Sequence, residues 1–560
     1  MENNFDVIIA GGGLAGLTLG IQLKNARPSI SICIIESSNG DHKVSAHKVG
    51  ESTVELGTYY LREVLGLADY LDQDQLPKHG LRFFLSPEHK ENIDKRYEIG
   101  PVLAPPTPSH QLDRGIFENE LIRKNQKIGN IVRLAERVNE AILNKEGHKI
   151  TVNSKTESTT LTSKWFVDTT GRSSFLKKQF NLAKDIDHDI NAIWFRLKGV
   201  IDISDWSDNT EWKDQLGPGL RRLSTTHLMG EGYWVWLIPL VTGNTSVGIV
   251  ADPRYHEFKS INRLDNAIQW LEKFEPQCAK HITAKRDDIL DFKILKSFAY
   301  NSTKLFSEDR WCLSGESGVF LDPFYSPGTD FISLSNTWIT DLISKDLNGE
   351  DIYVQNIVYE KVFQAMIENW AEVYRNKYPL FGSTEIMATK IIWDWANYWS
   401  IQTLMFMNNG YTNMNVLKKL FFGENGLGLK LAALNSNIQS LFVNWQPEYN
   451  EEIKATYLDP FEIDFLKDLH LGLSQKYNED ELIEKIKSNI SLLEQIGAEI
   501  IRHAVQKTKH INMSDTINPY HDNIVTSDIK EEDKIDVNIA IQPSIQEDWQ
   551  KVWMPQMVNS

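Results

Sequence analysis

Hydrophobic positions divide the chain into regions with different periodicities. Through about residue 350, short runs rich in β-branched residues alternate with helical stretches, and Ile30–Ile35, Trp165–Val167 and Trp311–Leu313 have the composition of buried strands. Strands that alternate with helices are typical of an α/β fold built on a parallel sheet. We therefore expect residues 1–350 to form one α/β body.

Three later or inserted segments depart from this alternation. From about 190 to 250, strand-like runs follow one another directly, which predicts an antiparallel sheet inserted into the body. In residues 351–512, apolar residues recur at helical spacing, which predicts a mainly helical C-terminal region. Residues 513–560 are polar and weakly periodic, so we expect a loosely structured tail, with Trp549 and Trp553 as the side chains that can return it to the body.

Composition narrows the class of protein. Of the 560 residues, 41% are hydrophobic and 24% are charged, which fits a globular chain of several folding units. The formal net charge of −17 argues against a nucleic-acid partner or an anionic membrane surface. Three widely spaced cysteines predict neither a disulfide framework nor a metal site. No apolar run reaches the ~20 residues that span a bilayer, and none resembles a signal peptide, so a cytoplasmic protein is expected.

A dinucleotide-binding motif opens the chain. The apolar run Val7–Ala10 leads directly into G-G-G-L-A-G, and a helical pattern follows. Such glycines allow a tight turn beside a pyrophosphate, and the N–H groups of the next helix bind the anion. A second predicted strand ends at Glu36, 36 − 16 = 20 residues beyond the last glycine, where a carboxylate can bind ribose hydroxyls. The alternative is an ordinary glycine-rich turn. The cofactor-binding candidates are Gly11, Gly13, Leu14, Ala15, Gly16 and Glu36.

Later segments favour FAD over NAD. Phe166–Arg172 resembles the strand that flavoprotein hydroxylases place beside the adenine half of FAD, and Leu313–Ser317 resembles their ribityl-binding turn, with Glu316 in place of the usual aspartate. Gln111–Arg114 resembles a further cofactor-side element, through its arginine. The glycine-rich stretch 423–428 follows no predicted strand, so we interpret it as a turn between helices and expect no nicotinamide domain.

The segment Tyr233–Pro239 reads Y-W-V-W-L-I-P. In a strand, Trp234 and Trp236 point to the same face, because side chains alternate with a period of two. Two neighbouring indoles on one face can form a wall between two parts of a cavity. The alternative interpretation of any W-x-W pattern is a buried aromatic pair in an ordinary core.

A second segment, Phe320–Gly328, fits the pattern F-x-x-P-x-x-S-x-G. This pattern resembles a signature of the flavin-dependent halogenases, and the resemblance implies that backbone N–H groups at the end of the loop hold a halide, an anion that needs donors in a dry pocket. Pro327 has no N–H, so Gly328 and Thr329 are the candidate halide-binding residues. The alternative is a Pro-Gly loop before a helix, which we expect from Asp330 to Ile343.

Lys78 is the third candidate, in the segment K-H-G-L-R-F-F. A single lysine is usually a surface residue. A lysine whose pKa is lowered by desolvation can instead react with hypohalous acid as an amine, or polarise it as an ammonium.

These three motifs together resemble the flavin-dependent halogenases that act on phenols and pyrroles, which share the fold of FAD-dependent aromatic hydroxylases. The resemblance covers about residues 1–350. Lys48–Thr53 is similar to the V-G-E-[AS] segment that this family places under the flavin, which adds Gly50 and Glu51 to the cofactor-binding candidates. The resemblance implies a Rossmann-type FAD-binding fold in which Trp234 and Trp236 separate the substrate from the flavin and Lys78 is catalytic.

The same resemblance implies a reaction. FADH2 from a separate flavin reductase, O2 and chloride or bromide give hypohalous acid, which passes the two tryptophans and reaches Lys78. Tryptophan halogenases carry a glutamate before the serine of F-x-x-P-x-x-S-x-G, whereas this chain has Phe324 and Tyr325. We therefore expect a small, electron-rich and phenolic aromatic substrate, either free or tethered to a carrier protein.

Two other functions stay open at this point. A flavin-dependent aromatic monooxygenase or a geranylgeranyl-reductase-like enzyme has a similar cofactor domain, and the latter carries a Y-x-W-x-F-P strand. A flavoprotein without catalysis, which binds a partner or senses redox state, is a third interpretation. Pro327 in the halide loop favours either alternative, whereas Lys78 and the two halogenase motifs argue against them.

Overall fold

The glycine-rich motif follows the central strand of a mostly parallel sheet. The computed structural model describes residues 3–40, 48–86, 88–422, 426–445, 456–508 and 539–554. Parallel pairing of β1 with β10 and with β2 brings the carboxyl ends of these strands to one edge. In spatial order the strands are β18 (Phe306–Ser307), β19 (Trp311–Leu313), β10 (Ser158–Asp168), β1 (Asn4–Ala10), β2 (Ile32–Glu36) and β7 (Ile131–Leu134), with β9 (His148–Asn153) and β8 (Arg137–Ile142) continuing from β10.

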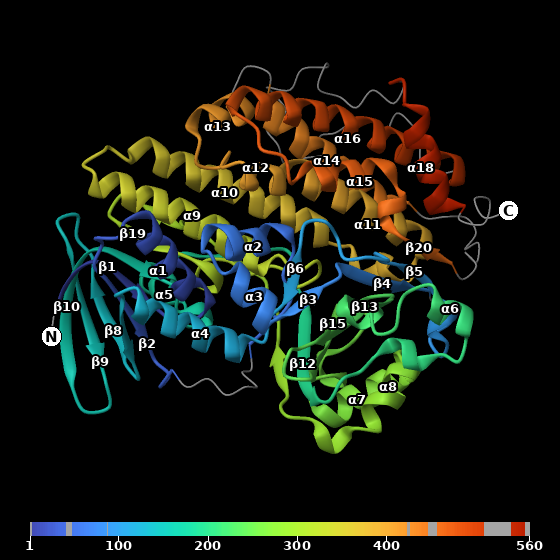
Figure 1. Cartoon of the computed structure of the whole chain (residues 1–560), viewed down its shortest axis with the longest axis horizontal. Helices are drawn as coiled ribbons and strands as arrows, with labels where there is room; N and C mark the ends of the chain where they lie inside the picture. The colour runs from blue at the N-terminus through green and yellow to red at the C-terminus, as the bar shows by residue number, and fades with distance from the viewer. Residues whose placement is uncertain are drawn as a thin grey trace.

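A second sheet lies beside the first and confirms the predicted strand-rich insertion (Figure 1). Its central strands are antiparallel: β12 (Asn191–Lys198), β15 (Asn244–Ala251), β14 (Tyr233–Pro239) and β13 (Thr225–Gly230). Strands from outside this segment extend both edges, namely β16 (Lys293–Leu295) on one side and β4 (Leu81–Leu85), β5 (Tyr97–Ile99) and β20 (Tyr457–Leu458) on the other. The sequence pattern did not predict these four additions.

Both faces of the second sheet are covered, which explains why all seven residues of β14 are buried. Tyr233, Val235 and Leu237 pack into a core with α7 (Leu264–Phe274) and α8 (Pro276–Thr283). Trp234 and Trp236 belong instead to the large core on the opposite face. The period-two alternation of the strand thus separates the two tryptophans from their neighbours, as predicted.

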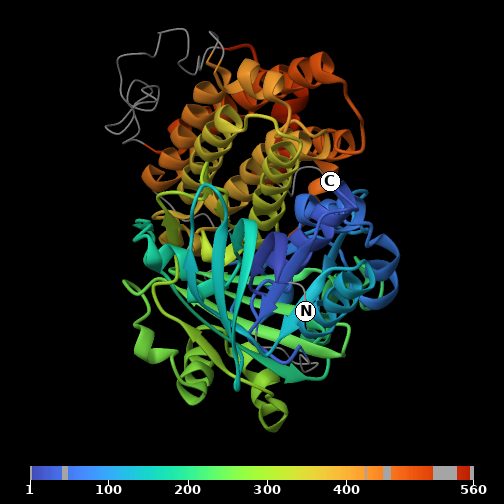
Figure 2. The same cartoon turned by 90° about the vertical axis from the view of Figure 1, so that its left-hand side faces the viewer.

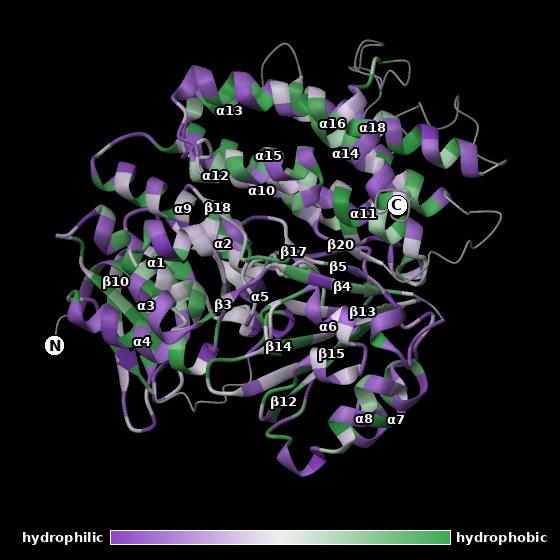
Figure 3. Cartoon of the chain, turned by 45° about the vertical axis from the view of Figure 1, so that its right-hand side comes forward, coloured by the Kyte–Doolittle hydropathy of each residue, from purple (hydrophilic) through white to green (hydrophobic). Residues whose placement is uncertain are grey.

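Helices form a layer over both sheets, which confirms the mainly helical C-terminal region (Figures 1 and 2). Apolar residues gather on the sides of these helices that face the sheets and one another (Figure 3). The layer comprises α9 (Gly328–Leu347), α10 (Tyr353–Tyr374), α11 (Thr384–Asn397), α12 (Leu404–Met407), α13 (Met414–Phe421), α14 (Leu427–Asn444), α15 (Asp464–Gly472), α16 (Glu479–Lys507) and α18 (Pro543–Trp553).

Shorter elements connect the sheets and position the site. Strand β3 (Leu76–Lys78) pairs with β6 (Ser109–Gln111), and this ribbon lies between the two sheets. Helix α1 begins directly after the glycines and leads to β2. The remaining elements are α1 (Leu14–Ala26), α2 (Glu55–Tyr59), α3 (Ala68–Asp74), α4 (Arg114–Lys127), α5 (Phe175–Gln179), α6 (Thr210–Asp214), β11 (Ala183–Asp185) and β17 (Tyr300–Ser302).

Two segments differ in detail from the sequence expectation. The stretch expected to be a loose tail contains α18, in which Trp549 is buried and stacks on Trp553 with ring centroids 4.8 Å apart; most of this stretch lies outside the described residues. The glycine-rich stretch 423–428, expected to be a turn between helices, runs into α14, whose first two residues are Leu427 and Gly428; residues 423–425 lie outside the described residues. Within the described ranges, each helix is too short or too polar to span a bilayer.

Candidate active site

A cavity of ≈ 870 Å³ opens where the strands of the first sheet end. Helix α1 begins at this cavity, and within the described residues no side chain caps its first turn, so its N–H groups are available to an anion. The lining brings together seven of the ten predicted cofactor-binding residues, namely Gly11, Gly13, Leu14, Ala15, Glu36, Arg114 and Glu316.

Glycine is required where the turn approaches β10 and α1. Gly11 has φ +113°, and a Cβ there would lie 2.3 Å from the carbonyl oxygen of Thr169. A Cβ on Gly16 would lie 2.0 Å from the carbonyl oxygen of Gly11. Gly16 therefore packs beneath the turn and does not line the cavity. At the edge of the cavity, Glu36 accepts the N–H of Gly12 at 2.7 Å.

Charged side chains line the far side of the same cavity. Glu316 pairs with Arg172, whose Nε lies 3.1 Å from the carboxylate. Arg114 donates to the carbonyl of Val49 at 2.7 Å and thereby fixes the segment expected to lie under the flavin. A glycine turn, an uncapped helix N-terminus and a carboxylate at the end of β2 fit the pyrophosphate and ribose of a dinucleotide.

A smaller cavity of ≈ 90 Å³ adjoins the first, and Leu14, Arg114 and Glu316 line both. Gly50 and Glu51, the residues that the sequence predicts under the flavin, line this cavity. Burial raises the pKa of Glu51 to about 7, although a hydrogen bond from Ser246 opposes the shift. The other predicted residues in the lining are Trp234, Trp236, Gly328 and Thr329.

Trp234 and Trp236 lie side by side, with ring centroids 5.6 Å apart. Both indoles are buried, and each N–H has a partner: Trp234 donates to the hydroxyl of Tyr378 at 3.0 Å, and Trp236 donates to the hydroxyl of Ser246 at 3.2 Å. These bonds fix the two rings against rotation at one wall of the smaller cavity.

The loop Phe320–Pro327 ends at the same cavity. Helix α9 begins at Gly328, two residues before the predicted start, because the chain already has helical backbone angles at Pro327. The N–H groups of Gly328 and Thr329 therefore belong to the first turn of a 20-residue helix, whose dipole favours an anion. Ser326 has φ +61° and donates its hydroxyl to Ser52 at 3.0 Å, which holds this strained part of the loop.

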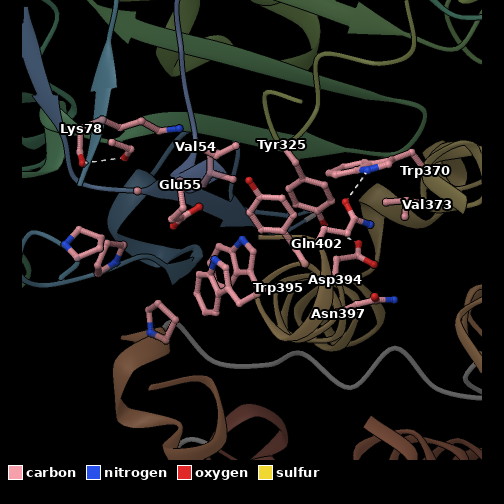
Figure 4. A pocket seen from close by; sticks show the side chains of 18 of the residues that line it. Val54, Glu55, Lys78, Tyr325, Trp370, Val373, Asp394, Trp395, Asn397 and Gln402 are labelled. Atoms are coloured by element: carbon pink, nitrogen blue, oxygen red, sulfur yellow. Dashed lines mark hydrogen bonds between the residues drawn. The ribbon is translucent and has the colours of Figure 1, made fainter. Parts of the chain in front are cut away.

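Lys78 lies in a separate pocket, shown in Figure 4. Tyr325 of the loop lines this pocket, whereas the next loop residues, Ser326 and Pro327, line the smaller cavity. Its side chain is 2% exposed, and Nζ donates to the carbonyl of Thr53 at 2.5 Å. Burial lowers the pKa of Lys78 to about 7, although the carboxylates of Glu55 and Asp330 oppose the shift. Amine and ammonium forms are therefore both available near neutral pH.

Aromatic rings separate and line the two spaces. Phe324 packs against Trp234 on the flavin side, with centroids 5.3 Å apart, and against Tyr325 on the Lys78 side, at 4.3 Å. The helical region contributes Trp370, Trp395 and Trp399 to the Lys78 pocket. Trp393 donates instead to Asn435 within the helical core. The C-terminal aromatics thus serve the pocket and the core alike.

Sequence reasoning missed several polar groups at the site. Glu55 and Asp394 line the Lys78 pocket, and His227 lines the smaller cavity, stacked on Trp234 with centroids 5.1 Å apart. None belongs to a motif. The only signal in the sequence was the placement of Glu55 four residues after Glu51, between apolar residues.

Comparisons with known proteins identify the class. A model of the FAD binding domain matches residues 4–236. The flavin-dependent halogenase chlA of Dictyostelium discoideum is 28% identical over 435 residues, 71% of this chain and 70% of that protein. The 1H-pyrrole-2-carbonyl-[peptidyl-carrier protein] chlorinase of Pseudomonas fluorescens is 25% identical, over 68% of this chain and 84% of that protein. The crystal structure of halogenase PltM covers 92% of this chain and 99% of its own, with a TM-score of 0.63 at 17% identity.

These matches agree with the large cavity at the end of β1. They also agree with the segments Tyr233–Pro239 and Phe320–Gly328, which contribute to the lining of the smaller cavity beside it. The protein uses FAD, and the comparisons indicate a flavin-dependent enzyme that is similar to the flavin-dependent halogenases.

Proposed function

We propose that this enzyme uses FADH2 from a separate flavin reductase, O2 and chloride or bromide to halogenate a phenolic, electron-rich aromatic substrate. FAD supplies the activated oxygen that oxidises the halide. The residues of the chain bind the cofactor, hold the halide, exclude water and present hypohalous acid to the substrate. Three buried cysteines without disulfides among the described residues are in keeping with a reducing, cytoplasmic setting.

The observation that carries the proposal is the position of Lys78. Its amine is buried, and it lies in an aromatic pocket one ring beyond the tryptophan wall. Burying a lysine is unfavourable unless the site uses it. An ammonium donates a hydrogen bond to hypohalous acid and makes its halogen more electrophilic, while an amine can bond the halogen directly.

The pocket favours an aromatic substrate over an aliphatic one. Flat rings of Trp395 and Trp399 stack 5.8 Å apart at an angle of 12° and offer a face to another ring. The chain has Phe324 and Tyr325 where tryptophan halogenases have a glutamate, which argues for a phenol that activates its own ring. The carrier-protein chlorinase among the relatives supports testing carrier-bound substrates beside free phenols.

The test is turnover with bromide. Purified enzyme, FAD, a flavin reductase, NADH and a panel of phenols should give products with the isotope pattern of bromine, and Lys78→Ala should lose this activity while it still binds FAD. Normal halogenation by Lys78→Ala would overturn the role of the lysine. Hydroxylated products with bromide present would show an aromatic monooxygenase, and a saturated double bond a geranylgeranyl-reductase-like enzyme.

A further inference from the structure

We propose that Glu55 is the general base that accepts the proton of the substrate hydroxyl while Lys78 holds the hypohalous acid. This inference rests on the proposed function and names the group that activates the phenol. Glu55 and Lys78 line the same pocket, and Figure 4 shows the carboxylate of Glu55 between Lys78 and Trp395.

Glu55 is distinguished from the neighbouring carboxylates by the small number of donors around its carboxylate. Asp394 also lines the pocket, but it accepts hydrogen bonds from Tyr325 at 2.8 Å, Lys390 at 2.6 Å and Gln439 at 2.7 Å. These three donors occupy both carboxylate oxygens of Asp394 and leave it little acceptor capacity for a substrate.

Asp330 is closed to the substrate as well. It accepts the N–H of Gly57 at 2.9 Å and the hydroxyl of Tyr398 at 2.7 Å, and it does not line the pocket. The carboxylate of Glu55 accepts its own backbone N–H, and the Nε2 of His470 lies 3.5 Å from it. Glu55 thus has fewer donors around its carboxylate than Asp394 and has acceptor capacity left for a ligand.

The surroundings of Glu55 keep it ionised. Burial acts to raise its pKa, but the neighbouring imidazole of His470, the hydrogen bond from Glu55's own backbone N–H and, to a smaller extent, the charge of Lys78 outweigh this effect and hold the pKa below its usual value. The ring of His470 is fixed edge-on against Trp399 at 4.8 Å and Phe461 at 5.1 Å. His470 is therefore a positioning residue, which orients the carboxylate without touching the substrate.

The chemistry balances with these two side chains. Glu55 takes the hydroxyl proton as the ring carbon bonds the halogen. The halogen–oxygen bond breaks, and the released hydroxide takes a proton from the Lys78 ammonium and leaves as water. The product of this step is a neutral dienone. The Lys78 amine then removes the ring proton, and Glu55 returns its proton to the oxygen, so the net reaction consumes hypohalous acid and yields halophenol and water.

The first test compares phenols of different acidity. Glu55→Gln should lower kcat/KM about 10²-fold or more for an ordinary phenol, the usual contribution of a general base. A polyfluorinated phenol is already ionised at the assay pH, so the ratio of kcat/KM between variant and wild type should stay near one for this substrate. The fluorine atoms also deactivate the ring, but they do so equally for both enzymes, so this effect cancels in the ratio. Glu63→Gln makes the same change of charge at an exposed position and serves as the control. Equal loss for both phenols, or loss for neither, overturns the proposal.

A second measurement needs no turnover. Bound 4-nitrophenol is titrated by its phenolate absorbance in wild type and Glu55→Gln. A carboxylate beside the hydroxyl disfavours a second negative charge, so the pKa of the bound phenol should be higher in wild type than in the variant. Equal titration midpoints for wild type and variant would mean that the hydroxyl of the bound phenol does not face Glu55. That result would overturn the role of Glu55 as general base, whatever the halogenation assay shows. Failure of the wild type to bind any phenol overturns the proposed substrate class and the base with it.

Discussion

The indole N–H of Trp234 and the hydroxyl of Tyr378 lie 3.0 Å apart and form a buried hydrogen bond between β14 and the helical layer. The same hydroxyl donates to Asp322 at 2.7 Å, and Asp322 also accepts the N–H of Phe324 at 2.9 Å. The tryptophan wall and the loop before α9 are therefore held by one network, so the two motifs form one structural unit.

Tyr378→Phe breaks this network and should uncouple the reaction. With the Trp234 N–H left unpartnered in a buried site, and Asp322 left with His188 and the Phe324 N–H but without the tyrosine hydroxyl, we expect a stability loss of about 1–3 kcal/mol. The fraction of oxidised FADH2 that yields halogenated product should fall and hydrogen peroxide should rise, measured together in one assay. Tyr359→Phe removes a buried hydroxyl that donates to Asp341 away from both cavities, and it should leave the yield per flavin unchanged.

Gly11→Ala and Gly13→Ala should separate folding from cofactor binding. Both residues line the large cavity, but a Cβ on Gly11 meets backbone at 2.3 Å, whereas one on Gly13 has no atom within 4 Å among the described residues. Gly11→Ala should lower the melting temperature of the cofactor-free protein and lose FAD. Gly13→Ala should keep the melting temperature of the wild type and should only weaken the binding of FAD, measured in a fluorescence titration. Equal melting temperatures for the two variants would contradict the geometry.

Lys78→Met should stabilise the protein in a pH-dependent way. The pKa of Lys78 falls from 10.5 to about 7 on folding, so the cost of burying the cation is fully present below pH 7 and disappears as the pH rises toward 10.5. The gain in melting temperature should be larger at pH 6.5 than at pH 9. The difference in the free energy of unfolding between variant and wild type should be on the order of 1 kcal/mol or more at the lower pH, since each pKa unit is worth about 1.4 kcal/mol. Lys487→Met, a partly exposed control, should show no such trend.

Ser52→Ala should weaken the binding of the halide more than the binding of the arene. Ser52 accepts the hydroxyl of Ser326 at 3.0 Å and lines the flavin-side cavity, not the Lys78 pocket. The variant also loses the contact of Ser52 with Thr225 at 2.9 Å, but it is the lost hydrogen bond to Ser326, worth about 1 kcal/mol, that should loosen the loop leading to Gly328 and Thr329. We expect the KM for bromide to rise several-fold while the KM for the phenol stays constant; the opposite pattern would place the halide elsewhere.

Much of the fold and the cofactor site was predictable because the signals are local. The strand, the glycine turn and Glu36 occur within 36 residues, and the period-two alternation of β14 places both tryptophans on one face. The helix after the halide loop was predicted with a late start, since Pro327 and Gly328 indicate a loop by composition although the backbone is already helical there.

The Lys78 pocket was not predictable in the same way. Glu55, Asp394 and His470 come from α2, α11 and α15, and no spacing along the chain relates them. The edge of the second sheet is similar: β20 is only two residues long, and it pairs with β5 across more than 350 positions. Contacts of this kind depend on how whole elements pack, which periodicity does not report.

Helix α18 has a consequence for work on the enzyme's selectivity. The indole N–H of Trp553 donates to Thr389 at 2.9 Å, and its ring stacks on His503 at 3.6 Å, so the last helix supports α11, which also carries Trp395. Shortening the chain before residue 543 removes this support from behind the pocket while it leaves the nucleotide cavity untouched. Chimeras that exchange the α18 segment, Pro543–Trp553, between relatives are therefore a route to a changed range of accepted arenes with unaltered flavin affinity.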